Sequence, residues 1–148
     1  MRVPIAILMR FKVLYEDIIA EYLDKLNRLL SKTNHSFEEL PPTSVLPKSL
    51  GVYVIFDKRS KVVIYAGRSK ILRRRLLGDH RRGNIDGSQF RKALGRSIGT
   101  ANEEEISEFI RKNCTYQFLK LDNFEEAVRF EHFITAIIGP VLNTKLQQ

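Results

Sequence analysis

Two short apolar runs separated by a charged gap set the strongest constraint on how this chain folds. They form the stretch "GVYVIFDKRSKVVIYAG" at residues 51–67, with "DKRSK" between them. A five-residue gap of this kind is a permitted hairpin loop between antiparallel strands. If Phe56 pairs with Val62, then Tyr53 lies directly opposite Tyr65 on one face of the sheet. The sequence therefore predicts that the two tyrosines lie side by side on one face of the sheet. Two interpretations of the pair stay open: a functional role, or an ordinary cross-strand aromatic contact.

Helical and extended patterns on either side of this hairpin predict an α+β fold with a small antiparallel sheet. Apolar residues at helical spacing indicate one amphipathic helix over residues 12–31. The proline-containing segment 40–49 that follows is typical of a linker. Further helices are expected at 70–77, at 88–95, from Asn102 and from Asn123 to Ile138, with a third strand at 114–121.

Positive charge is concentrated in one part of the chain. Residues 57–97 contain thirteen Lys or Arg against three Asp, whereas the whole chain has a net charge of +8. A local surplus of this kind is typical of a surface that binds a polyphosphate. A solvated basic face without a ligand would explain the same composition.

The sequence contains neither a disulfide framework nor a segment long enough to cross a membrane. Cys114 is the single cysteine and lacks the neighbouring ligands of a metal motif, so we expect a small core residue in a reducing compartment. The apolar start, residues 3–9, is too short to span a bilayer and lacks a signal-peptide cleavage site. A cytoplasmic or nucleoid-associated location is expected.

Two charged residues occupy positions that helical spacing assigns to the buried side of a helix. Arg75 falls within the apolar arc of the helix at 70–77, and Glu131 falls within the apolar arc of the last helix. A buried charge must be paired or must serve a ligand. Glu131 is therefore either the partner of Arg75 in a buried ion pair or a cation ligand in a cleft.

The ordered set of these motifs resembles the GIY-YIG nuclease superfamily. The resemblance rests on "GVY", "YAG", "RSKILRRRL" and "EEAVRFEHFITAIIGPVLN", and it covers residues 51–143. It implies a three-stranded antiparallel sheet flanked by helices, with a nuclease domain at 49–148 after a helical extension and linker at 1–48. It also implies a metal-dependent endonuclease that hydrolyses DNA phosphodiester bonds. The matching positions are Tyr53, Tyr65, Arg75, Glu131 and Asn143.

Each matching residue has a role that the resemblance implies. Glu131 is expected to hold a single Mg²⁺ or Mn²⁺ ion, a hard cation that keeps several waters. Arg75 is expected to neutralise charge on the phosphoryl oxygens. Tyr53 is expected to activate or orient the attacking water, with its pKa lowered by nearby cations, while Tyr65 hydrogen-bonds the phosphate or its partner tyrosine. Asn143 is expected to support the site rather than to touch the substrate.

The chain departs from the family pattern after the arginine. A histidine or tyrosine commonly stands four residues on, where this chain has Asp79, and His80 comes one residue later. An unbroken α-helix would direct His80 away from Arg75. Because Gly78 can end the helix and turn His80 back, we take His80 as the functional residue, with Asp79 as the alternative.

Several predictions about partners complete this interpretation. Two alternatives to a DNA nuclease are a non-catalytic nucleic-acid-binding module on the same fold and an RNA nuclease. The helix at 12–31 is expected to pack on the core or on a second copy of the chain, so a homodimer is a further prediction. The basic residues expected to contact DNA are Arg68, Lys70, Arg73, Arg74, Arg81 and Arg82.

Overall fold

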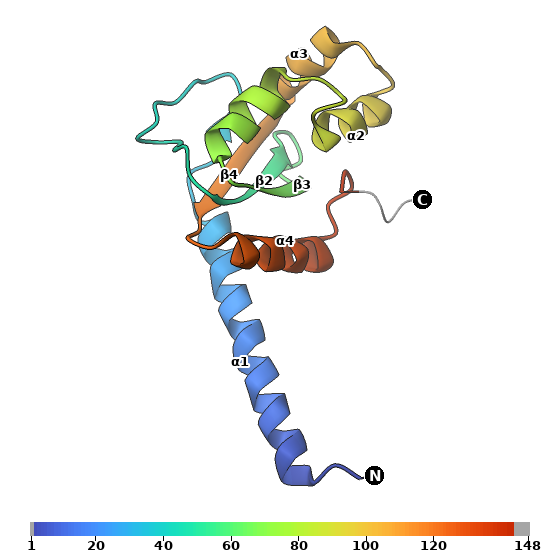
Figure 1. Cartoon of the computed structure of the whole chain (residues 1–148). Helices are drawn as coiled ribbons and strands as arrows, with labels where there is room; N and C mark the ends of the chain where they lie inside the picture. The colour runs from blue at the N-terminus through green and yellow to red at the C-terminus, as the bar shows by residue number, and fades with distance from the viewer. Residues whose placement is uncertain (1, 144–148) are drawn as a thin grey trace.

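The protein consists of an α+β body from which one long helix projects (Figure 1). The computed structural model describes residues 2–143, apart from the side chain of Phe11, so the end of the expected domain at 144–148 lies outside the described residues. The α+β class is confirmed. The elements are α1 (Ile5–Leu30), β1 (His35–Ser36), β2 (Gly51–Asp57), β3 (Val63–Ser69), the π-helix η1 (Arg74–His80), α2 (Gln89–Ile98), α3 (Glu103–Asn113), β4 (Cys114–Lys120) and α4 (Phe124–Ile138).

The sheet has four strands in the order β1-β4-β2-β3, and every neighbouring pair is antiparallel. The expectation of three strands is therefore wrong by one strand. The additional strand is β1, in which His35 pairs with Tyr116 and Ser36 pairs with Thr115. Two residues are too few for an alternating pattern to be recognised in the sequence.

The hairpin of β2 and β3 has a different register from the one expected. Tyr53 lies opposite Gly67, and Tyr65 lies opposite Ile55. Phe56 pairs with Val63 instead of Val62, which shifts the register by one residue. An irregularity between Ile55 and Phe56 shifts it by one residue more. Because the total shift is two residues, both tyrosines stay on one face of the sheet. Their ring centroids lie 6.4 Å apart.

The sheet separates two hydrophobic clusters, which gives the body three layers. On one face Tyr53 and Ile55 pack with buried residues of η1, α2 and α3. On the other face Val52 and Val54 pack with α4 and with the end of α1. Figure 1 shows α2 and α3 on one side of the sheet and α4 on the other. Alternate residues of β2 therefore serve different layers, as the two-residue period of a strand requires.

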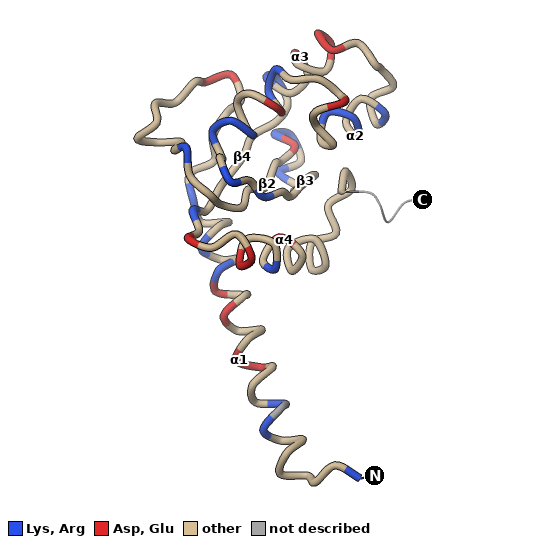
Figure 2. Tube along the Cα trace, viewed as in Figure 1, with Lys and Arg blue, Asp and Glu red and all other residues tan. Residues whose placement is uncertain are grey.

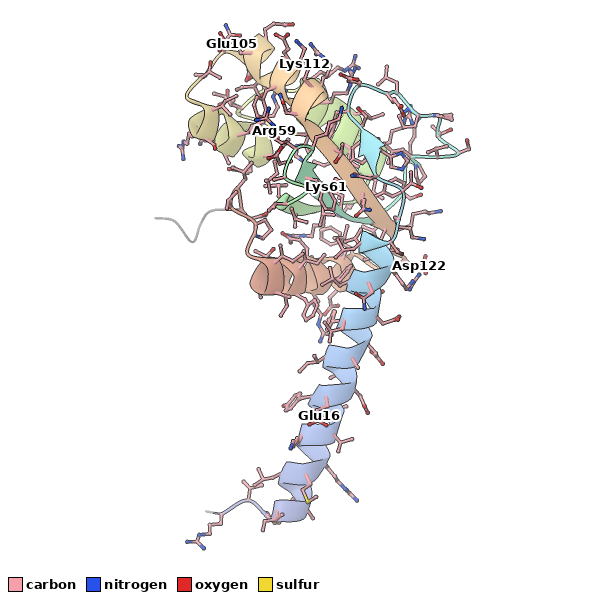
Figure 3. The ribbon with its side chains drawn as sticks, turned by 180° about the vertical axis from the view of Figure 1, so that it is seen from behind. Glu16, Arg59, Lys61, Glu105, Lys112 and Asp122 are labelled. Atoms are coloured by element: carbon pink, nitrogen blue, oxygen red, sulfur yellow. The ribbon has the colours of Figure 1, made fainter. Side chains whose placement is uncertain are left out.

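Helix α1 is longer than the sequence indicated and begins at Ile5, directly after Pro4. Only its C-terminal part joins the core, where Leu26 and Leu29 are buried and Tyr22 stacks on Phe133 at 5.1 Å. The part before Tyr22 extends away from the body (Figure 3), and its described side chains are exposed except that of Ile18, which is partly buried. No helix within residues 2–143 is both long and apolar enough to span a bilayer.

The expected helix boundaries near the C-terminal half are confirmed by their caps. The side chain of Asn102 accepts a hydrogen bond from the Glu105 N–H, and that of Asn123 accepts one from the Glu126 N–H. Gly139 ends α4 in the left-handed conformation, with φ of 61°. These caps fix where α4 begins and ends, and so fix the position of Glu131.

The segment expected to be a linker is packed into the body. Phe37 and Leu46 are both fully buried. The Arg73 guanidinium donates to the carbonyls of Pro41 at 2.6 Å and Leu46 at 3.1 Å, while Arg81 Nε donates to the carbonyl of Phe37 at 2.7 Å. Phe37 and Leu46 therefore belong to the core, whereas most residues between them are exposed, and the domain boundary at residues 48 and 49 stays a prediction.

Replacing Arg73 by alanine should destabilise the protein by about 1–3 kcal/mol, because two carbonyls lose their charged donor. Arg74→Ala is the matched control: Arg74 is the next residue and is exposed, so its loss should change the free energy of unfolding by no more than about 0.5 kcal/mol. Urea unfolding of the two variants measures the difference. Equal effects would contradict the structural role of Arg73.

Candidate active site

A cavity of about 220 Å³ lies at the edge strand β3 and collects the residues singled out in the sequence. Tyr53 and Tyr65 face it from one side of the sheet, and Arg75 and His80 reach it from η1. Glu131 reaches it from α4, which covers the other side of the sheet. Both layers contribute because β3 has no neighbouring strand beyond it. The predicted residues that line the cavity are Tyr53, Tyr65, Arg68, Arg75, His80 and Glu131.

The Tyr53 side chain is held between the core and a glycine. It is only 2% exposed, and its hydroxyl lies 2.5 Å from Nε2 of His80. A Cβ atom at Gly67, the residue opposite on β3, would lie 2.3 Å from the Tyr53 oxygen. The final glycine of "YAG" is therefore needed so that the phenol can lie across the strand.

The π-helical form of η1 decides where His80 points. The Arg81 N–H donates to the carbonyl of Leu76, five residues back, instead of the four of an α-helix. The wider turn keeps His80 on the side of the cavity that Arg75 also lines. The expectation that Gly78 ends the helix is wrong, since η1 continues through it. His80 is buried at 1% exposure, and its Nδ1 lies 2.7 Å from Ser88 Oγ.

Asp79 is the counter-charge of Arg75 rather than a residue of the cavity lining. Its carboxylate lies 3.1 Å from the Arg75 guanidinium, with both side chains about one third exposed. This pair joins neighbouring turns of one helix and leaves Arg75 accessible from the cavity. Ion pairs of this exposure are weak, so a phosphate can compete for Arg75.

Glu131 forms its ion pair with Arg68, so the alternative in which Glu131 pairs with Arg75 is wrong. The physical reason is that Arg68 lies two residues after Ala66 and opposite Val52, both of which pack on the face that α4 covers. The Glu131 side chain is 13% exposed and the Arg68 side chain is 35% exposed. Arg68 therefore belongs to the cavity itself rather than to a surrounding basic surface.

Asn143 contacts the backbone of β3 rather than the cavity. Its Oδ1 accepts from the Ala66 N–H and its Nδ2 donates to the Ala66 carbonyl, each at 2.7 Å. The N–H of Leu142 also donates to the carbonyl of Ile64 at 2.9 Å. These bonds satisfy the free edge of the strand between Tyr65 and Gly67.

The other basic residues expected to bind DNA divide into two groups. Lys70, Arg74 and Arg82 are exposed, and Lys70 lies 4.9 Å from the ring centroid of Phe124. Arg73 and Arg81 donate to carbonyls of residues 37–46, as described above. Lys70, Arg74 and Arg82 therefore have no hydrogen bond to a backbone carbonyl within residues 2–143, whereas Arg73 and Arg81 each use part of their guanidinium group to hold residues 37–46.

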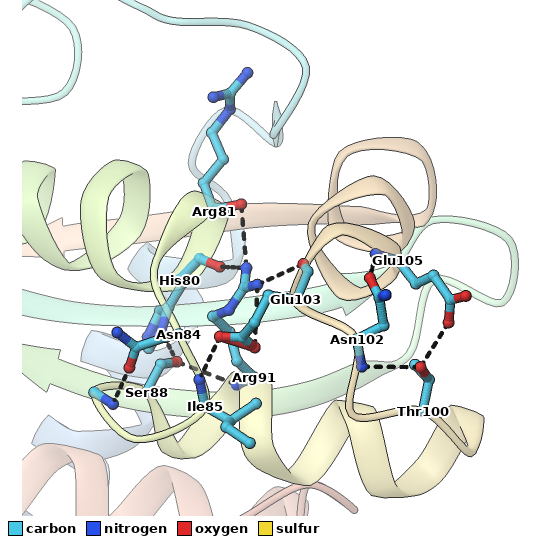
Figure 4. A network of polar contacts seen from close by, with 11 residues as sticks. His80, Arg81, Asn84, Ile85, Ser88, Arg91, Thr100, Asn102, Glu103 and Glu105 are labelled. Atoms are coloured by element: carbon cyan, nitrogen blue, oxygen red, sulfur yellow. Dashed lines mark hydrogen bonds and ion pairs between the residues drawn. The ribbon is translucent and has the colours of Figure 1, made fainter.

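The sequence interpretation missed Arg91 and Ser88, which hold His80 in place without lining the cavity. Arg91 is fully buried and donates to the carbonyls of His80 at 3.0 Å, Arg81 at 3.3 Å and Glu103 at 2.9 Å (Figure 4). It thus satisfies carbonyls at the end of η1. Arg91 lies in the apolar arc of α2 with Leu94, so the test that selected Arg75 would have found it.

Burial, rather than the nearby cations, dominates the pKa values of both tyrosines. Desolvation raises the pKa of Tyr53 well above 10.0, with a smaller opposite effect from Arg75. Desolvation and the carboxylate of Glu131 raise the pKa of Tyr65. The cationic side chains of the protein therefore do not lower the pKa of Tyr53 below its ordinary value, contrary to the expectation. Both phenols keep their protons at neutral pH.

The donor set of the cavity fits a magnesium ion. Within residues 2–143 no group of three or more His, Cys, Asp or Glu side chains is close enough to form a protein-only metal cage. Mg²⁺ does not need one, because it keeps several waters and takes one or two carboxylates. Glu131 supplies one such carboxylate inside a cavity large enough for water.

Residues 22–148 match the family profile described as the GIY-YIG catalytic domain. Among solved structures, the chain is similar to the GIY-YIG N-terminal endonuclease domain of UvrC from Thermotoga maritima bound to magnesium, at 24% identity over 68% of this chain and 89% of that chain, with a TM-score of 0.41. An asparagine-to-alanine point mutant of that domain is similar at 23% identity over 66% of this chain and 86% of that chain, with a TM-score of 0.39. No curated protein matches the chain.

The buried His80 should make the stability of the protein depend on pH. Burial, together with Arg75 and Arg91, lowers the pKa of His80 from 6.5 to about 3. Unfolded His80 binds a proton below pH 6.5, whereas folded His80 stays neutral down to about pH 3. Its contribution to stability is therefore complete above pH 6.5 and is lost as the pH falls.

Guanidinium unfolding at several pH values between about 7 and 4 measures this loss, with a slope of at most about 1.4 kcal/mol per pH unit from one group. His80→Gln should remove that part of the slope. His132→Gln is the control, since His132 is exposed on α4. The assignment is wrong if the wild type and His80→Gln lose stability in parallel.

Proposed function

The chain belongs to the GIY-YIG family and is a GIY-YIG-type endonuclease, and on this premise we propose that it hydrolyses DNA phosphodiester bonds with one divalent metal ion. One observation carries the proposal: two carboxylates (Glu131 and Asp86), two guanidinium groups, two phenols and an imidazole line a single cavity. A module that only bound nucleic acid would have no need of the Glu131 carboxylate among those cations, because a carboxylate repels phosphate.

Glu131 is the residue that would hold the metal, as Mg²⁺ or Mn²⁺. When bound there, the ion would act as a Lewis acid on the scissile phosphate and stabilise the leaving oxygen. Arg68 is the counter-charge of Glu131. A cation would compete with Arg68 for the carboxylate, and the displaced guanidinium would then be available to a phosphate oxygen.

Arg75 is proposed to neutralise the charge that develops on the phosphoryl oxygens. Its guanidinium faces the cavity and is held by only one weak, partly exposed ion pair. A planar group that is always charged suits phosphate oxygens better than an ammonium does. Lys70, Arg74 and Arg82 would contact neighbouring phosphates of the backbone, because their side chains are exposed and they lie within two residues, in the chain, of the cavity residues Arg68, Arg75 and His80.

The two phenols are proposed to handle the attacking water and the phosphate. Tyr53 reaches the cavity with a protonated hydroxyl next to His80, so it would orient the water through a hydrogen bond. Tyr65 would hydrogen-bond the phosphate from the neighbouring position on β3. Asn143 would act indirectly by holding the β3 backbone that carries Tyr65.

Glu131→Gln should abolish Mg²⁺-dependent cleavage of DNA while leaving DNA affinity within a few-fold, since the amide keeps the shape of the side chain and loses the metal ligand. Glu125→Gln is the matched control on the exposed side of α4, and it should cleave at the wild-type rate. Cleavage of labelled duplex and plasmid with Mg²⁺ and with EDTA measures both variants. Turnover by Glu131→Gln near the wild-type rate would overturn the metal assignment.

Whether the protein cleaves DNA or RNA is tested with a DNA strand and an RNA strand of the same base sequence. We expect cleavage of the DNA strand to exceed cleavage of the RNA strand in the same Mg²⁺ buffer. If RNA is cut faster, the chemistry of the site stands and the substrate class changes. The cytoplasmic or nucleoid-associated location stays a prediction.

We also propose that a second copy of the chain covers the projecting part of α1. Ile7, Leu14 and Ile19 are exposed on the side of the helix that continues the buried residues Leu26 and Leu29. Charge along the helix favours a second copy in the antiparallel direction, as Figure 2 shows by basic residues near its start and acidic residues further on. The charged residues in question are Arg10 and Lys12, then Glu16, Asp17, Glu21 and Asp24.

Leu14→Glu should weaken this dimer by about tenfold or more, since burying one leucine contributes about 1.5–3 kcal/mol. Val13→Glu is the control, because Val13 is similarly exposed but lies on the polar side of α1. Sedimentation velocity over a range of protein concentrations measures the dissociation constants. A wild-type chain that stays monomeric, or equal effects of the two variants, would contradict the proposed interface.

A further inference from the structure

The His80 ring is hydrogen bonded at both nitrogens inside the core. Nε2 lies 2.5 Å from the Tyr53 hydroxyl oxygen and Nδ1 lies 2.7 Å from Ser88 Oγ. A neutral imidazole carries one N–H, so one of these nitrogens donates and the other accepts. The choice decides whether the Tyr53 hydroxyl gives its hydrogen to His80 or keeps it for the cavity.

Ser88 constrains that choice, because it is also the N-cap of α2. Its Oγ accepts the N–H of Arg91 at 3.1 Å, and the side chain is 1% exposed (Figure 4). Within the part of the chain that the structure describes, the only other hydrogen-bond partner of Ser88 Oγ is Nδ1 of His80. The hydroxyl hydrogen of Ser88 therefore has one available acceptor, which is that nitrogen.

The two tautomers differ in how many buried groups they satisfy. If Nδ1 carried the proton, Ser88 Oγ would receive two donors and its own hydrogen would be buried without an acceptor, which is costly. If Nε2 carries the proton, Ser88 accepts from Arg91 and donates to His80, and His80 donates to Tyr53. The hydrogen left over is then that of Tyr53, which lines the cavity.

We propose that Ser88 is a positioning residue that fixes His80 as the Nε2–H tautomer and thereby directs the hydroxyl hydrogen of Tyr53 into the cavity. The tautomer follows from the hydrogen-bond geometry alone, whereas its catalytic consequence rests on the proposed function. In this arrangement His80 does not accept the proton of Tyr53. It donates to the phenol oxygen and stabilises any negative charge that develops there, while Tyr53 donates to water or phosphate.

Nitrogen-15 NMR of the full chain decides the tautomer, since protonated and unprotonated ring nitrogens have well separated chemical shifts. The chain has three histidines, and His80→Gln identifies the signals of His80 by their loss. We expect Nε2 protonated and Nδ1 unprotonated in the wild type and in Ser88→Thr. A wild-type spectrum with Nδ1 protonated overturns the proposal, whether or not the protein cleaves DNA.

Ser88→Asp tests whether residue 88 controls the proton. Aspartate retains the N-cap, but as a carboxylate it only accepts, so Nδ1 should become protonated in this variant. Cleavage should then fall by about 10²-fold, with DNA affinity within a few-fold and with Ser88→Thr close to the wild type. Asn102→Asp is the control, because it places the same carboxylate at the N-cap of α3.

The two readouts separate the tautomer from its role in catalysis. If Ser88→Asp leaves Nδ1 unprotonated, residue 88 does not set the tautomer and the proposal is wrong. If Nδ1 becomes protonated and the cleavage rate is unchanged, the positioning role is wrong although the tautomer is right. Should the variant fail to fold, the wild-type spectrum and Ser88→Thr still decide the tautomer.

Discussion

The hydrogen bond between Tyr53 and His80 joins the central strand of the sheet to the π-helix, and the site is arranged around it. It forms in the core, where both side chains are almost completely buried, so each polar atom needs a partner. Gly67 makes room for the phenol on one side, and Ser88 engages the far nitrogen of the imidazole. Arg91 in turn holds the carbonyl of His80, so the histidine is fixed through both its ring and its backbone.

The edge position of β3 allows both layers of the body to reach one cavity. Residues of an interior strand that point to opposite faces are separated by the sheet, whereas here Tyr65 and Arg68 open onto the same space. Glu131 can therefore meet Arg68 from the α4 layer. An exposed strand edge is also a place for unwanted pairing, and Asn143 satisfies part of this edge through the backbone of Ala66.

The basic segment between the hairpin and α2 has several physical tasks, and charge alone does not separate them. Arg73 anchors the chain at residues 41–46, and Arg91 is buried within the body. Arg75 faces the cavity with a carboxylate beside it. Arg74 and Arg82 remain exposed and are the ones suited to contact a long polyanion. A local surplus of arginine therefore indicates a phosphate-binding surface only when the arginines that are bonded within the fold are left out of the count.

The sequence by itself determined the α+β class, the caps and end of α4, and several of the side chains that line the cavity, among them Tyr53, Arg75 and Glu131. These depend on local rules: Asn123 caps because its side chain reaches the next turn, and Gly139 stops the helix because it adopts a positive φ. Only the tertiary structure decided how the residues pair. The register of the tyrosines depends on an irregularity in the hairpin, and the direction of His80 depends on a π-helical turn. The partner of Glu131 depends on which helix covers which face of an edge strand, and such relations join segments far apart in the chain.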